Sequence, residues 1–268
     1  MFPVLLMTDV HTIDEKEVVC KFVISPVSYR VSSMRLHRFF VSHDVSKGGT
    51  ITLPEPKVIH QMRSVFRFHP GDKVVLFNGD GTDYVSEIVT LERERGTFHI
   101  VEQRPALWKP RVKLTMVVSM TKKDTIEWSI QKAVELGVSV FVPVISQRSE
   151  KKGFNTERVR RIIIEATEQS GRADLMEVSE PVSLDEWLVR GDGCVIAFHT
   201  SGETLSMTDV SGHISITTFI GPEGGWSDEE LSIFKEKGFL IRSLSTPVLR
   251  AETAVTSVAS ILVQATHR

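Results

Sequence analysis

The sequence predicts an α/β protein in which a small β-barrel precedes a domain built on a largely parallel sheet. From Val112 onward, apolar strand-like runs alternate with helical patterns, which is typical of a parallel sheet with crossover helices. Before that point, residues 34–104 hold only short strand-like runs split by turn residues, which indicates a barrel. The chain has 268 residues, enough for two modest domains.

Changes in composition predict the domain boundaries. Residues 1–33 show no clear period, and we interpret them as an N-terminal extension outside the core; a genuine docking tail is the alternative. Residues 34–104 form the predicted barrel, in which Pro-Gly-Asp and Asn-Gly-Asp-Gly sequences mark the hairpin turns. Residues 105–111 contain two prolines and are the predicted linker. The α/β domain covers residues 112–268.

Start and stop signals define the elements of the α/β domain. A helix is expected from Asp124, with Glu127 completing a capping box and Gly137 ending the helix. Ser227 and Glu230 form a second predicted capping box. The remaining expected elements are strands at 112–120, 138–146, 194–198, 214–220 and 239–244, a helix ending at Gly171, and a final helix from Glu252 to Thr266.

Bulk properties exclude several classes of protein. The net charge is −2, so charge alone does not indicate a nucleic-acid partner. Cys20 and Cys194 have no metal-binding spacing and define no disulfide framework, which favours a reducing, cytoplasmic location and no metal. No apolar run approaches the ~20 residues that cross a bilayer. The opening MFPVLLM is too short for a signal-peptide core, so we expect no membrane partner.

The segment TTFIGPEGGWSDEE places a glycine-rich turn between a buried strand and a capped helix. The predicted strand ends at Ile220, and residues 221–225 read Gly-Pro-Glu-Gly-Gly. Ligands bind beyond the carboxyl ends of strands in open α/β sheets, and glycines let backbone groups approach a ligand closely. The turn matches neither the dinucleotide fingerprint nor a phosphate loop. A ligand site and a purely geometric turn both remain open.

A second segment, LSTPVLRAETAVTSVAS, follows another predicted strand. Leu244 and Leu249 offer apolar surface, Arg250 supplies a permanent cation, and Glu252 places a carboxylate near a helix start. The alternative for Glu252 is that it only favours the helix N-terminus. The final helix carries small and branched residues that suit packing against a second subunit or against the same chain: Ala254, Val255, Val258, Ala259, Ile261, Leu262 and Ala265.

Basic residues concentrate near the start of the predicted barrel. Residues 30–73 hold eight Arg or Lys against three Asp or Glu, although the whole chain is slightly acidic. We interpret the arginines as RNA-phosphate contacts and the interleaved phenylalanines as barrel core. The alternative is a solvated basic face. The candidate RNA-binding residues are Arg35, Arg38, Arg63 and Arg67.

Five ordered segments resemble one known family. The segments are MRLHRFFV, KKDTIEWSIQKAVELGV, EATEQSGR, FIGPEGGWSDEE and LRAETAVTSV. From Met34 to the C-terminus the chain resembles the RsmE family of 16S rRNA uracil-N3 methyltransferases, in the SPOUT superfamily. The resemblance implies a PUA-like RNA-binding barrel and a C-terminal domain with a deep trefoil knot, a rare exception to unthreaded topology.

The resemblance also implies S-adenosylmethionine (AdoMet) as cofactor, a C2 homodimer, and 16S rRNA or the small ribosomal subunit as partner. Two loops would hold the cofactor, at Ile220–Gly225 and Leu244–Leu249, with His199 and Thr200 in a third wall. The expected cofactor-binding residues are His199, Ile220, Gly221, Pro222, Glu223, Gly224, Gly225, Leu244, Ser245, Pro247 and Leu249.

The chemistry of uracil assigns roles to the two catalytic candidates. Its N3 is a weakly acidic imide that must lose a proton, so Arg250 could stabilise charge on the base and Glu252 could accept the proton or orient Arg250. Because N3 lies on the Watson–Crick edge, the target uridine must be unpaired or flipped out.

The chain departs from the family pattern at two positions. Ser245 stands at a usual glycine, where its Cβ is expected to narrow the cofactor's approach, and Gln147 replaces a usual glutamate. Two other functions remain as alternatives: a non-catalytic RNA-binding assembly factor, and an α/β enzyme that uses another nucleotide.

Overall fold

The computed structural model describes residues 36–106, 108–150, 153–188 and 193–266. The chain divides into two units after Leu36, and the second unit is His37–Arg268. The extension predicted at residues 1–33, and the RNA-binding candidate Arg35, lie outside the described residues. All that follows concerns the second unit.

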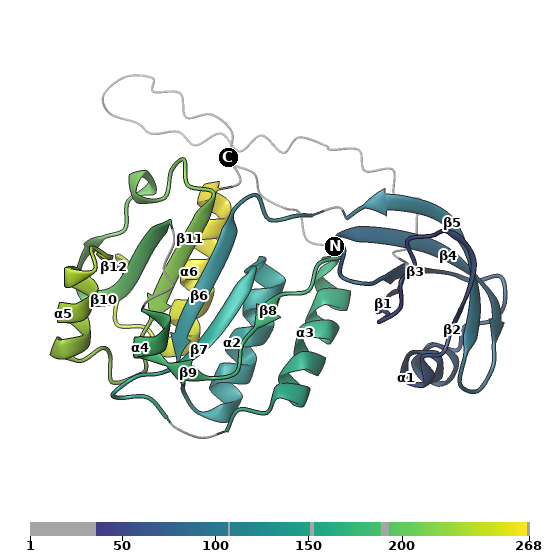
Figure 1. Cartoon of the computed structure of the whole chain (residues 1–268), viewed down its shortest axis with the longest axis horizontal. Coiled ribbons are helices and arrows are strands. Elements are labelled where there is room, and N and C mark those ends of the chain that lie inside the picture. The colour runs from purple at the N-terminus through teal and green to yellow at the C-terminus, as the bar shows by residue number, and fades with distance from the viewer. Residues whose placement is uncertain (1–35, 107, 151–152, 189–192, 267–268) are drawn as a thin grey trace, which may run out of the picture. The chain divides into compact units, whose positions relative to one another are not determined.

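A five-stranded sheet, here called the β-domain, occupies the first part of this unit (Figure 1). Its strand order is β1-β3-β4-β5-β2, with β1 parallel to β3 and the other pairs antiparallel. The Asn-Gly-Asp-Gly turn joins β3 to β4 as the sequence predicts. The strands are Arg38–Phe40 (β1), Gly49–Leu53 (β2), Lys73–Phe77 (β3), Thr82–Leu91 (β4) and Gly96–Pro105 (β5).

The β-domain also contains a short helical segment that the strand pattern did not predict. An α-helix at Pro56–His60 (α1) continues into a π-helical turn at Gln61–Val65. Pro56 occupies the first helical turn, where its missing N–H leaves no intrahelical bond unmade. Ile59 and Met62 are buried in the core of the β-domain, so tertiary burial stabilises a helix too short to form alone.

The predicted parallel sheet is confirmed in the remainder of the chain (Figure 1). Its strands run in the order β12-β10-β11-β6-β7-β8, and β9 also pairs with β7. All the pairings are parallel. The strands are Lys113–Ser119 (β6), Val140–Ile145 (β7), Glu177–Val178 (β8), Val182–Ser183 (β9), Cys194–Thr204 (β10), Ser215–Ile220 (β11) and Leu240–Ser243 (β12).

Helices cover both faces of the parallel sheet. Alternate residues of one strand point to opposite faces, so Met116 and Val118 join one apolar cluster and Val117 joins another. The first cluster contains side chains of α2, α3 and α6, and the second contains those of α4 and α5. The helices are Lys123–Leu136 (α2), Thr156–Ser170 (α3), Leu184–Trp187 (α4), Asp228–Glu236 (α5) and Ala251–Thr266 (α6), with a 3-10 turn at Met207–Asp209.

The helix ends agree with the predicted stop signals but with only one of the two predicted capping boxes. Gly137 and Gly171 end α2 and α3 in the left-handed conformation. The box at Ser227 and Glu230 is present. The box at Asp124 and Glu127 is wrong, because α2 begins one residue earlier, after Lys122, and no side chain caps it. The Glu127 carboxylate instead accepts a hydrogen bond from Arg158 of α3.

No helix in the described part of the chain is long and apolar enough to span a membrane. The trefoil knot stays a prediction, because strand order and pairing do not report on the threading of the chain.

Candidate functional site: a cavity at the carboxyl ends of three strands

A cavity of about 570 Å³ lies where β11 and β12 end and where the pairing of β10 with β11 stops, at Phe198. Its lining brings together three segments that are far apart in sequence: Phe198–Thr200, Ile220–Trp226, and Ser243–Leu249 except Ser245. Ala251, Ala254 and Val258 of α6 complete the wall. The cavity is therefore on the carboxyl-end side of the parallel sheet, where ligands of such sheets bind.

Ten of the eleven sequence-predicted cofactor residues line this cavity. They come from all three walls: His199, Ile220, Gly221, Pro222, Glu223, Gly224, Gly225, Leu244, Pro247 and Leu249. The exception is Ser245, whose hydroxyl lies 3.3 Å from the Thr204 hydroxyl. The expectation that its Cβ narrows the cavity therefore finds no support in the lining.

The loop after β11 has a backbone that needs glycine. Gly225 has a φ of +67°, in the left-handed region that favours glycine, and its N–H donates to the Pro222 carbonyl. A Cβ on Gly221 would lie 3.3 Å from the Trp226 indole. The loop is therefore a tight turn packed on a buried tryptophan, which leaves backbone atoms facing the cavity.

Two side chains from neighbouring segments hold this loop in place. Arg148, which follows β7, donates through Nη1 to the carbonyls of Gly224 at 2.9 Å and Trp226 at 3.3 Å. Glu230 accepts from the backbone N–H groups of Ser227 and Gln147, each at 2.8 Å. The sequence showed Glu230 only as a helix cap, and it gave no signal that Arg148 reaches the glycine loop.

The third wall of the cavity, at Phe198–Thr200, is hydrogen-bonded to the same glycine loop. Trp226 is buried, and its indole N–H donates to the Phe198 carbonyl at 3.2 Å. His199 follows, with Nδ1 lying 2.7 Å from the Ser201 hydroxyl. Burial lowers the pKa of His199, with the nearby Arg148 and Lys235 also lowering it and Asp228 opposing them. Burial therefore favours the neutral form of the imidazole on this wall.

The two catalytic candidates flank the cavity instead of lining it. Arg250 is exposed and lies between Leu249 and Ala251, both of which line the cavity. Glu252 is half-buried in the first turn of α6. Within the described residues, no hydrogen bond or ion pair joins the two side chains to each other. The prediction that Glu252 orients Arg250 is therefore not supported by a direct contact between these two side chains.

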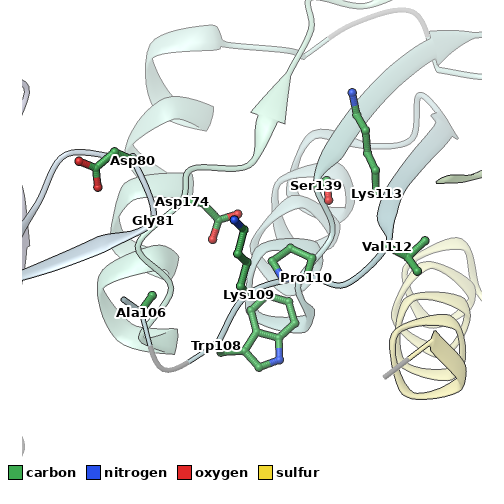
Figure 2. Close-up of a pocket in the computed structure, with 11 residues that line it drawn as sticks. Asp80, Gly81, Ala106, Trp108, Lys109, Pro110, Val112, Lys113, Ser139 and Asp174 are labelled. Carbon is green, nitrogen blue, oxygen red and sulfur yellow. The ribbon is translucent and has the colours of Figure 1, made fainter. Parts of the chain in front are cut away.

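A second cavity, of about 210 Å³, lies at the opposite edge of the sheet (Figure 2). Its lining includes Lys113 and Ser139, which stand at the amino ends of β6 and β7. The other lining residues come from the β-domain, the link and the turn after α3: Gly79, Asp80, Gly81, Ala106, Trp108, Lys109, Pro110, Val112 and Asp174. Because ligands of parallel sheets bind at the carboxyl ends, the larger cavity has the position expected of a ligand site.

The structure separates the RNA-binding candidates of the β-domain. Arg63 and Arg67 are exposed. Arg38 is not, and its assignment as a phosphate contact is corrected: its side chain is 9% exposed and forms a two-pronged ion pair with buried Asp83 at 2.6 and 2.8 Å. Arg38 also donates to the Arg172 carbonyl at 2.8 Å. Its guanidinium is thus used within the protein.

Two family comparisons match most of the described chain. Residues 109–263 match the RNA methyltransferase domain family, and residues 56–101 match the RNA methyltransferase PUA domain family. Ribosomal RNA small subunit methyltransferase E of Aquifex aeolicus is 33% identical over 85% of this chain and 99% of its own length. The protein of the same name from Rickettsia conorii is 28% identical over 87% of this chain and 98% of its own.

Solved structures of similar proteins contain the expected cofactor. A methyltransferase from Legionella pneumophila, in complex with bound SAM, superposes with a TM-score of 0.76, 28% identity, and coverage of 85% of this chain and 97% of its own. Ribosomal RNA small subunit methyltransferase E from Neisseria gonorrhoeae, bound to S-adenosyl methionine, gives a TM-score of 0.75, 27% identity, and coverage of 85% and 96%.

A PUA-type β-domain followed by a parallel sheet with a glycine-loop cavity defines a two-domain RNA methyltransferase. Within that class, the chain belongs to the ribosomal RNA small subunit methyltransferase E family, which confirms the family resemblance seen in the sequence.

Proposed function

We propose that this protein uses AdoMet to methylate N3 of a specific uridine in 16S ribosomal RNA. The observation that carries the proposal is the cavity at the ends of β10, β11 and β12, which gathers ten of the predicted cofactor residues in a member of an RNA methyltransferase family. The alternative of a non-catalytic assembly factor is disfavoured, since a protein that only binds RNA has no need of this cavity.

The residues of the cavity fit AdoMet. The glycines at 221, 224 and 225 keep side chains out of one wall, while Leu244 and Leu249 add apolar surface to another. Bound there, AdoMet supplies an activated methyl group on its sulfonium. The walls contribute by fixing orientation, because alignment of the reacting groups accounts for much of the rate of such transfers.

Arg250 and Glu252 are the proposed catalytic residues. Arg250 is exposed beside the cavity, so its guanidinium is free to reach O2 or O4 of a uracil and stabilise the charge left when N3 loses its proton. The Glu252 carboxylate, in the first turn of α6, is the proposed proton acceptor. The target uridine must present N3 unpaired or flipped out of its stack.

The two domains divide the work in this proposal. Residues 34–104 bind RNA through Arg63 and Arg67, residues 105–111 link the domains, and residues 112–268 hold the cofactor and carry out transfer. The substrate is 16S rRNA or the small ribosomal subunit, and the enzyme acts in the cytoplasm without a metal.

A C2 homodimer is also proposed, on a different surface from the one the sequence suggested. Val255, Val258, Ala259 and Leu262 of α6 are buried in the core of their own chain. Val248, in the second cofactor loop, is 84% exposed, and a large apolar side chain so exposed suits a subunit interface. Light scattering at micromolar concentration should give a dimer, and Val248→Asp should shift it to monomer; a wild-type monomer with full activity would remove the dimer from the proposal.

Methyl transfer is tested directly. Small ribosomal subunits from cells lacking the gene are incubated with purified protein and AdoMet, and the rRNA is mapped by mass. The proposal expects one added methyl group, on N3 of a single uridine, only when both protein and AdoMet are present. Methylation at ribose or at another base atom would refute the N3 assignment, and no transfer despite AdoMet binding would favour the assembly factor.

A further inference from the structure

An aromatic cluster lies on the β-domain, outside both cavities. It consists of His37, Phe66 and Phe68, whose ring centroids are 4.4 to 5.8 Å apart. The Phe66 and Phe68 rings are stacked, with 25° between their planes. The sequence-based interpretation that these phenylalanines are core is wrong for Phe66, which is 36% exposed beside Val65 at 64%.

The cluster is held from beneath by the core of the β-domain. Phe39 is 1% exposed and contacts Phe66 and Phe68 edge to face, with centroid distances of 5.6 and 6.2 Å. Rings that are already fixed lose little conformational freedom when a partner binds them. The cluster is therefore a rigid surface that needs no rearrangement to stack against a planar ligand.

Arg67, between the two phenylalanines, has a backbone conformation that favours glycine. Its φ is +57°, and among the described residues no other non-glycine has a positive φ. The Phe66 N–H donates to the Gln61 carbonyl and the Phe68 N–H to the Met62 carbonyl, so Arg67 closes the helical segment where glycine is usual. Strained residues of this kind concentrate at functional sites. Closing the turn does not require arginine, and the exposed Arg67 carries a positive charge between Phe66 and Phe68 in the sequence.

The surroundings of the cluster are positively charged. Residues 57–71 contain three Lys or Arg and no Asp or Glu. Arg63 donates to the backbone carbonyl of Glu92, whose carboxylate pairs with Arg95, and the Asp72 carboxylate accepts from the His69 N–H. Within the described residues, no carboxylate pairs with Arg63 or Arg67. A polyanion fits this surface better than an apolar protein partner does.

We propose that His37, Phe66 and Phe68 form a stacking surface for unpaired RNA bases, and that Arg67 binds a phosphate of the same strand. Every base has a π-face, so aromatic stacking recognises single-stranded RNA without requiring a particular sequence. The proposal rests on the proposed RNA substrate and adds how that RNA is held: the strand is recognised as unpaired at this surface as well as at the cofactor cavity.

The test measures fluorescence anisotropy of the full-length protein with a labelled single-stranded oligoribonucleotide and with the same sequence as a duplex. Phe66→Ala should weaken single-strand binding by roughly tenfold, and Phe66→Leu, which keeps apolar contact with Phe39, should weaken it similarly. Phe66→Tyr should bind like wild type. Val89→Ala, which alters an apolar side chain of β4 that is 44% exposed, is the matched control and should change nothing.

Arg67→Gly separates binding from folding. Glycine accepts the positive φ, so the thermal midpoint should stay at or above that of wild type. Single-strand affinity should nevertheless fall. The slope of log affinity against log salt concentration should become less steep by about one, as expected for the loss of one phosphate contact. Lys237→Gly removes one exposed positive charge from the other domain and should leave the slope unchanged.

Three results would overturn the stacking proposal. In the first, the folded variants Phe66→Leu and Arg67→Gly bind the single strand with wild-type affinity. In the second, both substitutions weaken duplex binding as much as single-strand binding, and in the third, the wild-type protein does not bind the single strand. Methyl transfer to small ribosomal subunits is assayed on the same preparations. Transfer by wild type together with unaltered affinities in the variants would end this proposal alone, whereas no transfer by wild type would end the proposed function.

Discussion

At the scale of single residues, two arginines of the same basic segment have opposite environments. Arg38 is 9% exposed and pairs with Asp83, while Arg67, between Phe66 and Phe68 in the sequence, is exposed. A buried guanidinium needs a carboxylate or other acceptors, and Asp83 and the Arg172 carbonyl accept from Nη1 and Nη2 of Arg38. The positions of these acceptors depend on the fold, so the sequence of the basic segment could not show which of its arginines are exposed.

Arg250→Lys tests the proposed role of Arg250 in catalysis. Lysine keeps the charge but loses the planar fork that reaches carbonyl oxygens in fixed geometry. AdoMet affinity should stay near that of wild type, while the single-turnover rate falls by roughly 10²–10³. Raising the pH should partly restore the rate, because more uracil N3 is then already deprotonated.

The control for Arg250 is calorimetric titration with AdoMet, which must show normal affinity before the rates are compared. Lys235→Arg, a change of the same kind in α5, should alter neither quantity. A normal single-turnover rate for Arg250→Lys at saturating AdoMet would remove Arg250 from the proposed catalytic residues.

Arg148→Gln tests whether the glycine loop depends on a side chain outside it. The variant removes charge-assisted hydrogen bonds to the carbonyls of Gly224 and Trp226, and such bonds each contribute about 1.5–3 kcal/mol. We expect AdoMet affinity, measured by calorimetry, to fall by at least about tenfold. Arg95→Gln, at an exposed ion pair, is the matched control. Unchanged affinity would mean that the loop holds its shape without Arg148.

At the scale of elements, the capping boxes show where local sequence is sufficient. Ser227 and Glu230 satisfy each other's backbone N–H groups at the start of α5. Asp124 and Glu127 have the same spacing in the sequence but form no capping box. Glu127 is instead buried against α3, where it pairs with Arg158. A cap pattern predicts a helix start reliably only when no tertiary partner competes for its side chains.

Ser227→Ala should destabilise the protein by about 1 kcal/mol, since it removes the side-chain acceptor for the Glu230 N–H. It should also weaken AdoMet binding, because α5 follows directly from the glycine loop. Urea denaturation and calorimetry measure the two effects. Ser232→Ala, an exposed serine in the same helix, is the control. Equal stability of the two variants would show that the cap does not contribute.

At the scale of the whole second unit, hydrogen bonds between described residues join the β-domain to the parallel-sheet domain. The Phe40 N–H of β1 donates to the Glu168 carboxylate of α3 at 2.9 Å, and Gly81 donates to the Ala173 carbonyl. Desolvation by burial raises the pKa of Glu168 to about 7, against the opposing effect of the Phe40 hydrogen bond. The contact therefore includes a carboxyl that titrates near neutrality.

This raised pKa makes stability depend on pH. The folded state holds the Glu168 proton more tightly than the unfolded state, so the free energy of unfolding should fall as pH rises from about 4.5 to about 7, by up to ~1.4 kcal/mol per unit. Glu168→Gln mimics the protonated acid. In urea denaturation it should match wild type at pH 5 and be more stable at pH 8.

Glu177→Gln, at an exposed carboxyl of β8, is the control for the loss of one negative charge and should show no such difference. If Glu168→Gln differs from wild type by the same amount at both pH values, Glu168 titrates in the ordinary carboxyl range.

Local sequence was sufficient to predict the α/β class, the alternation of strands and helices, and most helix ends. These features depend on residues close together in the chain: periodic apolar side chains, capping serines and glycines at turns. The two loops that line the cavity were expected from the family resemblance, because the residues alone left each of them open. Local sequence could not show that Arg148 holds the glycine loop, that Ser245 lies outside the cavity lining, that Arg38 is largely buried, or that Phe66 is exposed. Each of these depends on which distant segment packs against the side chain, and that packing is set by the fold as a whole.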